Sequence, residues 1–217
     1  MNTSTAAEIS IAAETKMGRP RGFDEDAVLE AAMRVFWEKS YEGTTIADLT
    51  QAMGINRSSM YAAFGDKESV FQRAMERYLD TRMTYIRQAL AQPSLQKVLA
   101  GLIQGTAEFL ATPGNPRGCL SIQGAMACGT DAEPIKDALI DLRKNAEGAL
   151  KRRLQQAQSE GELPREIQPA DFAHYLASVI AGLAVQAANG ATKAELRRVA
   201  EIALRCIEAG LWGSPSS

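Results

Sequence analysis

Residues 44–67 constrain the fold of this chain more than any other stretch, because they predict two short helices joined by a tight turn. Thr45 can cap the first helix, and Asp48 three residues later can complete a capping box. Gly54 is expected to end that helix, since a residue without Cβ enters the left-handed conformation at low cost. Asn56 can cap the second helix. This layout is that of a helix-turn-helix, whose second helix enters the major groove of DNA.

The second of these helices is predicted to have one face for a core and one for solvent. At about 100° per residue, Met60, Ala63 and Phe64 point toward the core. The opposite face carries short and polar side chains and no acid: Arg57, Ser58, Ser59, Tyr61 and Ala62. Hydroxyl groups can bond bases or phosphates, and an alanine methyl suits the methyl group of thymine. An ordinary helical hairpin is the alternative, and the two caps, the glycine turn and the acid-free face argue against it.

Four segments in a fixed order carry a resemblance to a known family. They are Met17-Gly-Arg-Pro-Arg, a helix ending near Tyr41-Glu-Gly, Thr44-Thr-Ile, and Met60-Tyr-Ala-Ala-Phe-Gly-Asp-Lys-Glu. From about Gly18 to Tyr78 this order and spacing resembles the DNA-binding domain of TetR/AcrR-type regulators. The resemblance implies an all-α fold, with a three-helix domain followed by a larger helical domain that dimerises and binds a small effector. It also implies a ligand-responsive transcriptional regulator, usually a repressor.

The resemblance also implies which residues contact double-stranded DNA. By position they are Thr44, Thr45, Arg57, Ser58, Ser59, Tyr61 and Lys67. Tyr61 and Lys67 are better placed for phosphates than for bases. One departure concerns the residues after Tyr61, because the family often has an aromatic residue and then a histidine where this chain has Ala62 and Ala63. Ala62 nevertheless lies on the predicted outer face.

Charge and composition restrict the class of DNA binder. A net charge of −2 excludes a general nucleic-acid coat protein, which would be strongly basic, and allows a site-specific binder. Lys16, Arg19 and Arg21 lie just ahead of the first helix with no acid among them. A basic arm in this place suits a phosphate or minor-groove contact, and a solvated basic tail is the alternative.

The sequence contains no pattern typical of a targeting signal or a metal site. No apolar run approaches the roughly 20 residues that span a bilayer, and the first residues lack the basic and apolar regions of a signal peptide. Three cysteines cannot form a closed disulfide framework and fit a reducing cytoplasm. One histidine and no Cys-x-x-Cys predict no zinc site, and no other cofactor motif is present. An enzyme is disfavoured, since no nucleophile elbow, phosphate loop or Ser-His-Asp set is found.

The chain is predicted to divide into three parts. Residues 1–16 are a disordered extension, residues 17–66 a helix-turn-helix domain, and residues 67–213 an effector-binding and dimerisation domain. The apolar pattern predicts one helix from Lys67 to Leu90, about 35 Å long, that links the two domains. The last two long helices, which start at Pro169 and near Lys193, are short of polar surface. We assign one side of them to a second subunit, as in the four-helix bundle that the resemblance implies.

An effector site is expected among the helices of the second domain. Polar and sulfur side chains set among apolar residues are the candidates: Gln104, Glu108, Cys119, Gln123, Met126, Cys128, Tyr175 and Gln186. Each could equally be a core or interface residue. Cys119 and Cys128 allow an alternative function on the same scaffold, a thiol sensor of oxidants or electrophiles. A helical dimer that does not bind DNA is a third possibility.

Overall fold

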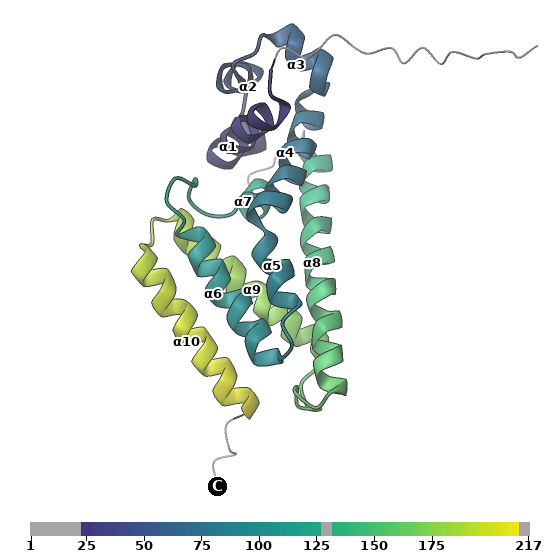
Figure 1. The fold of residues 1–217 in the computed structure, drawn as a ribbon, viewed down its shortest axis with the longest axis vertical. Helices are drawn as coiled ribbons and strands as arrows, with labels where there is room; N and C mark the ends of the chain where they lie inside the picture. Colours follow the sequence, from purple (N-terminus) through teal and green to yellow (C-terminus); the bar gives the residue numbers. More distant parts are fainter. Residues whose placement is uncertain (1–22, 127–131, 213–217) are drawn as a thin grey trace, which may run out of the picture.

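The computed structural model describes residues 23–126 and 132–212, with the side chains of Ala125 and Met126 left aside. These residues form ten helices and no strand, which confirms the predicted all-α fold. The predicted extension, residues 1–16, lies outside the described residues. Figure 1 shows α1, α2 and α3 at one end of the molecule and α4 running from them into the bundle formed by the later helices.

The first three helices are defined by local capping, as the sequence predicts. They are α1 (Glu25–Gly43), α2 (Ile46–Met53) and α3 (Arg57–Phe64). Thr45 and Asp48 form the full capping box of α2, and Gly54 ends that helix in the left-handed conformation, with φ of 65°. The Asn56 side chain accepts a hydrogen bond from the Ser59 N–H at 2.8 Å, which caps α3. The helix-turn-helix is therefore confirmed in its details.

The predicted single helix from Lys67 to Leu90 is wrong. The chain forms α4 (Lys67–Arg82) and α5 (Thr84–Leu90), and Met83 between them leaves helical geometry with φ of −103° and ψ of 14°. Beyond the break, the ring of Tyr85 packs against Gly105, where an added Cβ would lie 2.8 Å from it. Apolar spacing continues on both sides of Met83, so the pattern alone does not reveal the break.

The remaining helices build the larger end of the molecule. They are α6 (Leu95–Leu110), α7 (Leu120–Met126), α8 (Glu133–Ser159), α9 (Pro169–Ala188) and α10 (Lys193–Trp212). Ala132 precedes α8 without a side-chain cap. Figure 1 shows α8 along one side of the bundle and α10 along the other. Buried apolar residues from α1 to α10 form one connected core.

Two kinds of contact fasten α1 to the part of the chain that follows the helix-turn-helix. Arginines of α4 pair with acids of α1, and Arg77 reaches both Asp26, at 2.8 Å, and Glu30, at 3.1 Å. Arg73 pairs with Glu25, and Arg82 with Glu30, in the same way. On its other side, α1 bonds the main chain of the loop between α6 and α7. The Arg34 guanidinium donates to the carbonyl of Gly114 at 2.7 Å, and the Trp37 indole to that of Gly118 at 3.2 Å.

Candidate nucleic-acid interface and ligand cavity

The outer face of α3 is exposed and polar, as its sequence predicts. Met60 and Phe64 are buried in the core, whereas Arg57, Ser58, Tyr61 and Ala62 are exposed and Ser59 is half-buried. Arg57 lies one turn before Tyr61, and its guanidinium donates to the Tyr61 hydroxyl at 3.4 Å. Tyr61 keeps 42% of its surface exposed. An exposed helix face that carries no carboxylate can approach a polyanion such as DNA.

The residues that flank α3 differ in what they offer to a ligand. Thr45 is exposed, although its hydroxyl takes part in the capping box of α2. Thr44 is only 1% exposed, and its hydroxyl donates to the carbonyl of Ser40 at 2.6 Å, so its side chain is not available at the surface. Lys67 is half-buried with its ammonium 4.4 Å from the centre of the Tyr41 ring. Burial lowers the pKa of Lys67. Arg19 and Arg21 lie outside the described residues.

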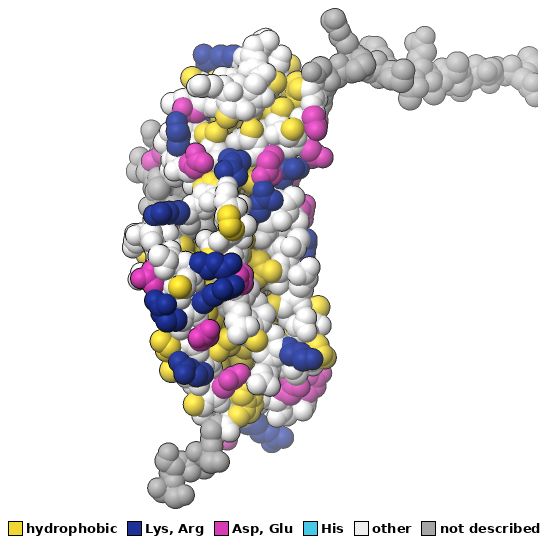
Figure 2. Space-filling model, turned by 60° about the vertical axis from the view of Figure 1, so that its left-hand side comes forward, with side chains coloured by type: hydrophobic (Ala, Val, Ile, Leu, Met, Phe, Trp, Pro, Cys, Tyr) yellow, Lys and Arg dark blue, Asp and Glu magenta, His cyan; other side chains and the backbone are white. Residues whose placement is uncertain are grey.

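The charge around this surface is acidic rather than basic. Residues 23–67 contain eight Asp and Glu against four Lys and Arg, which gives a net charge of −4. On the face shown in Figure 2, basic and acidic side chains are interspersed, and no continuous basic band marks the helix-turn-helix end. Asp48 remains ionised at low pH because the Lys39 ammonium and the amide and hydroxyl of Thr45 hold its pKa at about 2. The cations of α3 and its flanks are therefore few and local.

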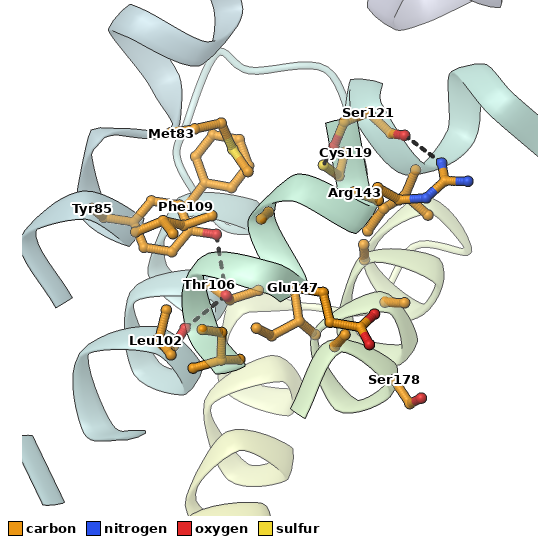
Figure 3. A pocket seen from close by; sticks show the side chains of 18 of the residues that line it. Met83, Tyr85, Leu102, Thr106, Phe109, Cys119, Ser121, Arg143, Glu147 and Ser178 are labelled. Carbon is orange, nitrogen blue, oxygen red and sulfur yellow. Dashed lines mark hydrogen bonds between the residues drawn. The ribbon is translucent and has the colours of Figure 1, made fainter. Parts of the chain in front are cut away.

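A cavity of about 320 Å³ lies inside the larger end of the molecule. It lies between α5, α6, α7, α8 and α9, and some of its lining residues, among them His174 and Ser178, are exposed to solvent. Figure 3 shows most of the side chains that line it. Its walls are mainly apolar: Met83, Ile86, Leu90, Leu102, Phe109, Leu110, Ile122, Ala146, Leu150, Ala177, Ile180, Ala181 and Ala184. Its polar lining comprises Tyr85, Thr106, Cys119, Ser121, Arg143, Glu147, His174 and Ser178. A mainly apolar hollow with a few polar groups is typical of small-molecule sites.

The polar groups of the cavity are divided between two ends. At one end the Tyr85 hydroxyl and the Thr106 hydroxyl lie 3.1 Å apart, and burial raises the pKa of Tyr85. At the other end Arg143 donates from Nη1 to the carbonyl of Ser121 at 2.8 Å, and Glu147 lies 3.2 Å from His174 Nδ1. Figure 3 shows Arg143, Glu147 and Ser178 across the cavity from Tyr85 and Phe109. One end is thus neutral and the other charged.

Side chains of the cavity wall contact the helix-turn-helix end directly. Phe109 stacks on Tyr85 inside the cavity, with ring centres 5.6 Å apart, and on Trp37 of α1, at 5.8 Å. The thiol of Cys119, also in the wall, lies 3.2 Å from the hydroxyl of Tyr78 of α4. Burial raises the pKa of Tyr78, so this hydroxyl stays neutral. A molecule in the cavity would therefore touch residues that pack directly on α1 and α4.

Most of the effector residues predicted from sequence lie elsewhere. Cys119 lines the cavity. Gln104, Tyr175 and Gln186 are exposed and outside its lining, and Glu108 pairs on the surface with Lys193 and Arg197 of α10. Gln123 is half-buried against Gly118, outside the lining. The Met126 side chain and Cys128 lie outside the described residues.

Sequence reasoning missed the charged end of the cavity. Arg143 and Glu147 are one helical turn apart on α8, on the same side as the buried residues Leu139 and Leu150. Two charged residues that interrupt a buried stripe were the available signal. Tyr85 and Phe109 gave no such signal, because aromatic residues at helical spacing are more often core residues than ligand contacts.

An exposed helix-turn-helix on a helical bundle with an apolar cavity defines a class, that of DNA-binding transcriptional regulators. Two family models match the chain: "Bacterial regulatory proteins, tetR family" over residues 28–74, and "Tetracyclin repressor-like, C-terminal domain" over residues 94–203. The chain belongs to the TetR family of bacterial regulators.

Relatives of known name are similar over most of their length. The transcriptional repressor ComR of Escherichia coli is 32% identical over 190 residues, which cover 87% of this chain and 90% of that protein. The repressor AcnR of Corynebacterium glutamicum is 26% identical over 177 residues, which cover 81% of this chain and 87% of that one. A structure of a cysteine-substituted form of the regulator CifR with a 26-base-pair operator has a TM-score of 0.82 and 36% identity, covering 87% of this chain and 98% of that one.

Within the described residues, no helix is both long and apolar enough to cross a bilayer. The same residues contain no group of three or more His, Cys, Asp and Glu placed to hold a metal ion.

Proposed function

We propose that this protein is a repressor that binds a palindromic operator as a homodimer and leaves it when a small, largely apolar effector fills the cavity. The observation that carries the proposal is the contact between the cavity wall and the DNA-binding end of the molecule: Phe109 of the wall stacks on Trp37 of α1. The operator complex of CifR, a protein 36% identical to this chain, supports the DNA-binding part.

The DNA contacts that we propose centre on α3. Ser58, Ser59 and Ala62 would meet base edges or the thymine methyl, because they are short and lie on the outer face. Arg57, Tyr61, Thr45 and Lys67 would meet phosphates, which fix the position of the helix in the groove. Thr44 would contribute through the fold, since its buried hydroxyl bonds the end of α1.

The acidic balance of residues 23–67 gives Arg19 and Arg21 a specific role in this proposal. With a net charge of −4 in that range, binding to phosphates needs cations from outside it. We infer that the arm ahead of α1 supplies them. Replacing both arginines by glutamine should weaken operator binding and make its dependence on salt less steep.

The proposed dimer uses α9 and α10. Large apolar side chains stay exposed on these helices, Tyr175 on α9 and Val199, Ile202 and Trp212 on α10. Covering them with a second copy would bring together two α3 helices for two half-sites, about 34 Å or more apart. In this arrangement residues 17–66 are the DNA-binding domain and residues 67–213 the effector-binding and dimerisation domain.

Release from the operator follows from the contacts of the cavity wall. An effector acts by binding one arrangement of the two DNA-binding ends more tightly than the other, and its effect cannot exceed that difference in affinity. An occupant that displaces Phe109 or Cys119 would also disturb Trp37, Gly118 and Tyr78. These residues hold α1 and α4, so the position of α3 would change with them.

Cys119 supports a second candidate function on the same scaffold, a sensor of electrophiles. Its buried thiol lines the cavity and lies 3.1 Å from the Ser121 hydroxyl. An electrophile that enters the cavity would reach this sulfur. Mass spectrometry after treatment with a small alkylating agent tests the idea: modification of Cys119 with release of operator supports it, and modification without release contradicts it.

Two negative expectations belong to the proposal. The family and its relatives are transcriptional regulators, and we propose that this chain acts by binding alone, without catalysis. We also propose that it works in the cytoplasm, where its operator lies. A helical dimer that has lost DNA binding remains the competing possibility, and it makes a different prediction for binding to DNA.

The deciding experiment is an anisotropy titration of the full chain against DNA that flanks its own gene. We expect saturable binding to one palindromic segment, far tighter than binding to shuffled DNA of the same composition, and weakening steeply with salt. A stoichiometry of one dimer or two per segment would fit the symmetry. Equal affinity for the palindrome and the shuffled control would overturn the proposal.

A further inference from the structure

We infer that the ligand of the cavity is an amphiphilic monoanion, with a carboxylate-like head at Arg143 and an apolar body that reaches Tyr85 and Phe109. The inference rests on the proposed function of the cavity as an effector site. It adds the chemical class of the ligand, which follows from where the charges of the lining lie.

The neutral end of the cavity requires an apolar body. Tyr85 and Thr106 bond to each other, and Thr106 also donates to the carbonyl of Leu102 at 2.7 Å, so these hydroxyls are already paired. The surrounding walls are alkyl groups and the ring of Phe109. A charge placed there would lose its water without gaining an ionic partner. The volume of about 320 Å³ is at the small end of the usual range for ligand sites, which indicates a small molecule.

Among residues 23–126 and 132–212, one cation at the charged end has no ionic partner. Its three ionisable groups are Arg143, Glu147 and His174. Glu147 has His174 as its partner at 3.2 Å. Arg143 bonds the neutral carbonyl of Ser121, and within the described residues it pairs with no carboxylate. A guanidinium has five N–H donors, and within the described part of the chain Arg143 uses one of them on the Ser121 carbonyl, which leaves the others for a ligand.

A ligand that binds at this end should therefore carry a negative charge near Arg143. The occupant removes water from Arg143, and a cation that loses its water is costly to bury unless a negative group takes the place of that water. Glu147 does not make the same demand, because the His174 ring already lies 3.2 Å from its carboxylate as a hydrogen-bond partner.

The head group should carry a single charge. Glu147 follows Arg143 by one helical turn and lines the same cavity, so a second negative charge on the ligand would be repelled. A cationic head would have to displace His174 from Glu147 and lie close to the Arg143 guanidinium. A carboxylate satisfies the available donors with one charge, and its two oxygens match the planar guanidinium.

The test compares three ligands that share one alkyl chain and differ in the head group: octanoate, octanamide and octylamine. Isothermal titration of the full-length protein without DNA measures each affinity. We expect octanoate to bind about tenfold or more tightly than octanamide, as a charge-assisted hydrogen bond implies. Arg143→Gln should abolish this preference. Arg152→Gln, an exposed arginine of the same helix outside the cavity lining, should leave it unchanged.

Two more variants separate charge from folding. Arg143→Lys keeps the positive charge and should retain a preference for octanoate, whereas Glu147→Gln removes the nearby carboxylate and should strengthen octanoate binding or leave it unchanged. Circular dichroism on heating checks that each variant is folded. If Arg143→Gln does not fold, the outcome rests on the wild-type preference together with these two variants.

Several results would overturn the inference. They are equal binding of octanoate and octanamide, a preference for octylamine that Glu147→Gln abolishes, an octanoate preference that survives Arg143→Gln, and no binding of any of the three. Because no DNA is present, these results do not depend on the repressor proposal. Octanoate that binds through Arg143 but leaves operator affinity unchanged would contradict the proposed function and not the ligand class.

Discussion

The two sites of this molecule are built in opposite ways. The outer face of α3 is convex and polar, and one short helix with the caps on either side of it supplies nearly all of it. The cavity is concave and mainly apolar, and its lining comes from residues between Met83 and Ala184 on several helices. A surface of the first kind can change residue by residue without altering the core, whereas nearly every change in the second also changes packing.

The two sites are also connected through side chains that lie between them. They share no residue, but Trp37 and Tyr78 lie between them and touch the cavity wall through Phe109 and Cys119. This arrangement should allow three separate failures: loss of DNA binding with the cavity intact, loss of ligand binding with α3 intact, and loss of the link with both sites intact.

The largest effect is expected from Ala62→Glu on the outer face of α3. The new carboxylate would point at DNA phosphates and add bulk in the groove, so operator affinity should fall roughly 100-fold or more. Anisotropy with operator DNA measures the loss. Ligand affinity and the unfolding temperature should stay unchanged, because Ala62 is exposed. Gln155→Glu, which adds the same charge on the exposed side of α8, should bind the operator normally. Retained binding by Ala62→Glu would remove α3 from the interface.

A smaller and more selective effect is expected from Trp37→Phe. This change keeps a ring against Phe109 but removes the N–H that donates to the carbonyl of Gly118. Operator and ligand should each still bind, while the factor by which ligand weakens operator binding falls about fivefold, the equivalent of one hydrogen bond. Operator titrations with and without ligand give this factor. Ser159→Ala, which removes a hydroxyl that donates to the carbonyl of Gln156 at 2.8 Å on the exposed end of α8, should leave it unchanged.

The same contrast explains what the sequence could predict. The helix-turn-helix could be predicted to the residue because its caps act over three positions: Thr45 with Asp48, and Asn56 with Ser59. Such signals need no knowledge of the rest of the fold. The outer face of α3 follows from helical periodicity in the same way. Thr44 departs from the expected contacts because its burial depends on the end of α1, where Ser40 leaves helical geometry.

The cavity could not be predicted in this way, because its lining is decided by how distant helices pack. Glu108 looks like a polar group among apolar residues, but α10 supplies Lys193 and Arg197 to pair with it on the surface. Tyr85 reaches the cavity only because the chain breaks at Met83 and Gly105 leaves room for its ring. Arg143 and Glu147 could have been identified from the sequence as charges within a buried stripe of α8. Their contacts with Ser121 and His174 could not, because those residues come from other helices.

A prediction of moderate size concerns the charged contacts between α1 and α4. Glu30 pairs with both Arg77 and Arg82, so Glu30→Gln should lower the free energy of unfolding by roughly 1 kcal/mol, as expected of partly exposed ion pairs. Chemical denaturation measures it. The response to ligand should persist, because the link through Trp37 is untouched. Glu76→Gln, an exposed change on α4, is the control and should cost less. A lost ligand response in Glu30→Gln would show that the charged contacts carry the signal instead.

The smallest effect is expected at the capping box of α2, where it depends on pH. The ammonium of Lys39, 2.6 Å from Asp48, and the amide and hydroxyl of Thr45 hold the pKa of Asp48 at about 2 in the folded protein, below its ordinary value of 3.8. A carboxyl with a lowered folded pKa stabilises the fold fully above its unfolded pKa, and this contribution is lost as pH falls through the folded pKa. The advantage of the wild type over Asp48→Asn in unfolding temperature should therefore shrink between about pH 4 and pH 2.

Lys39→Gln removes the largest cause of the lowered pKa of Asp48 and should move this loss of stability to higher pH. An advantage that stays constant across that range would mean that the cap stabilises α2 without the charge of Asp48, and the helix-turn-helix end would then depend on local hydrogen bonds alone.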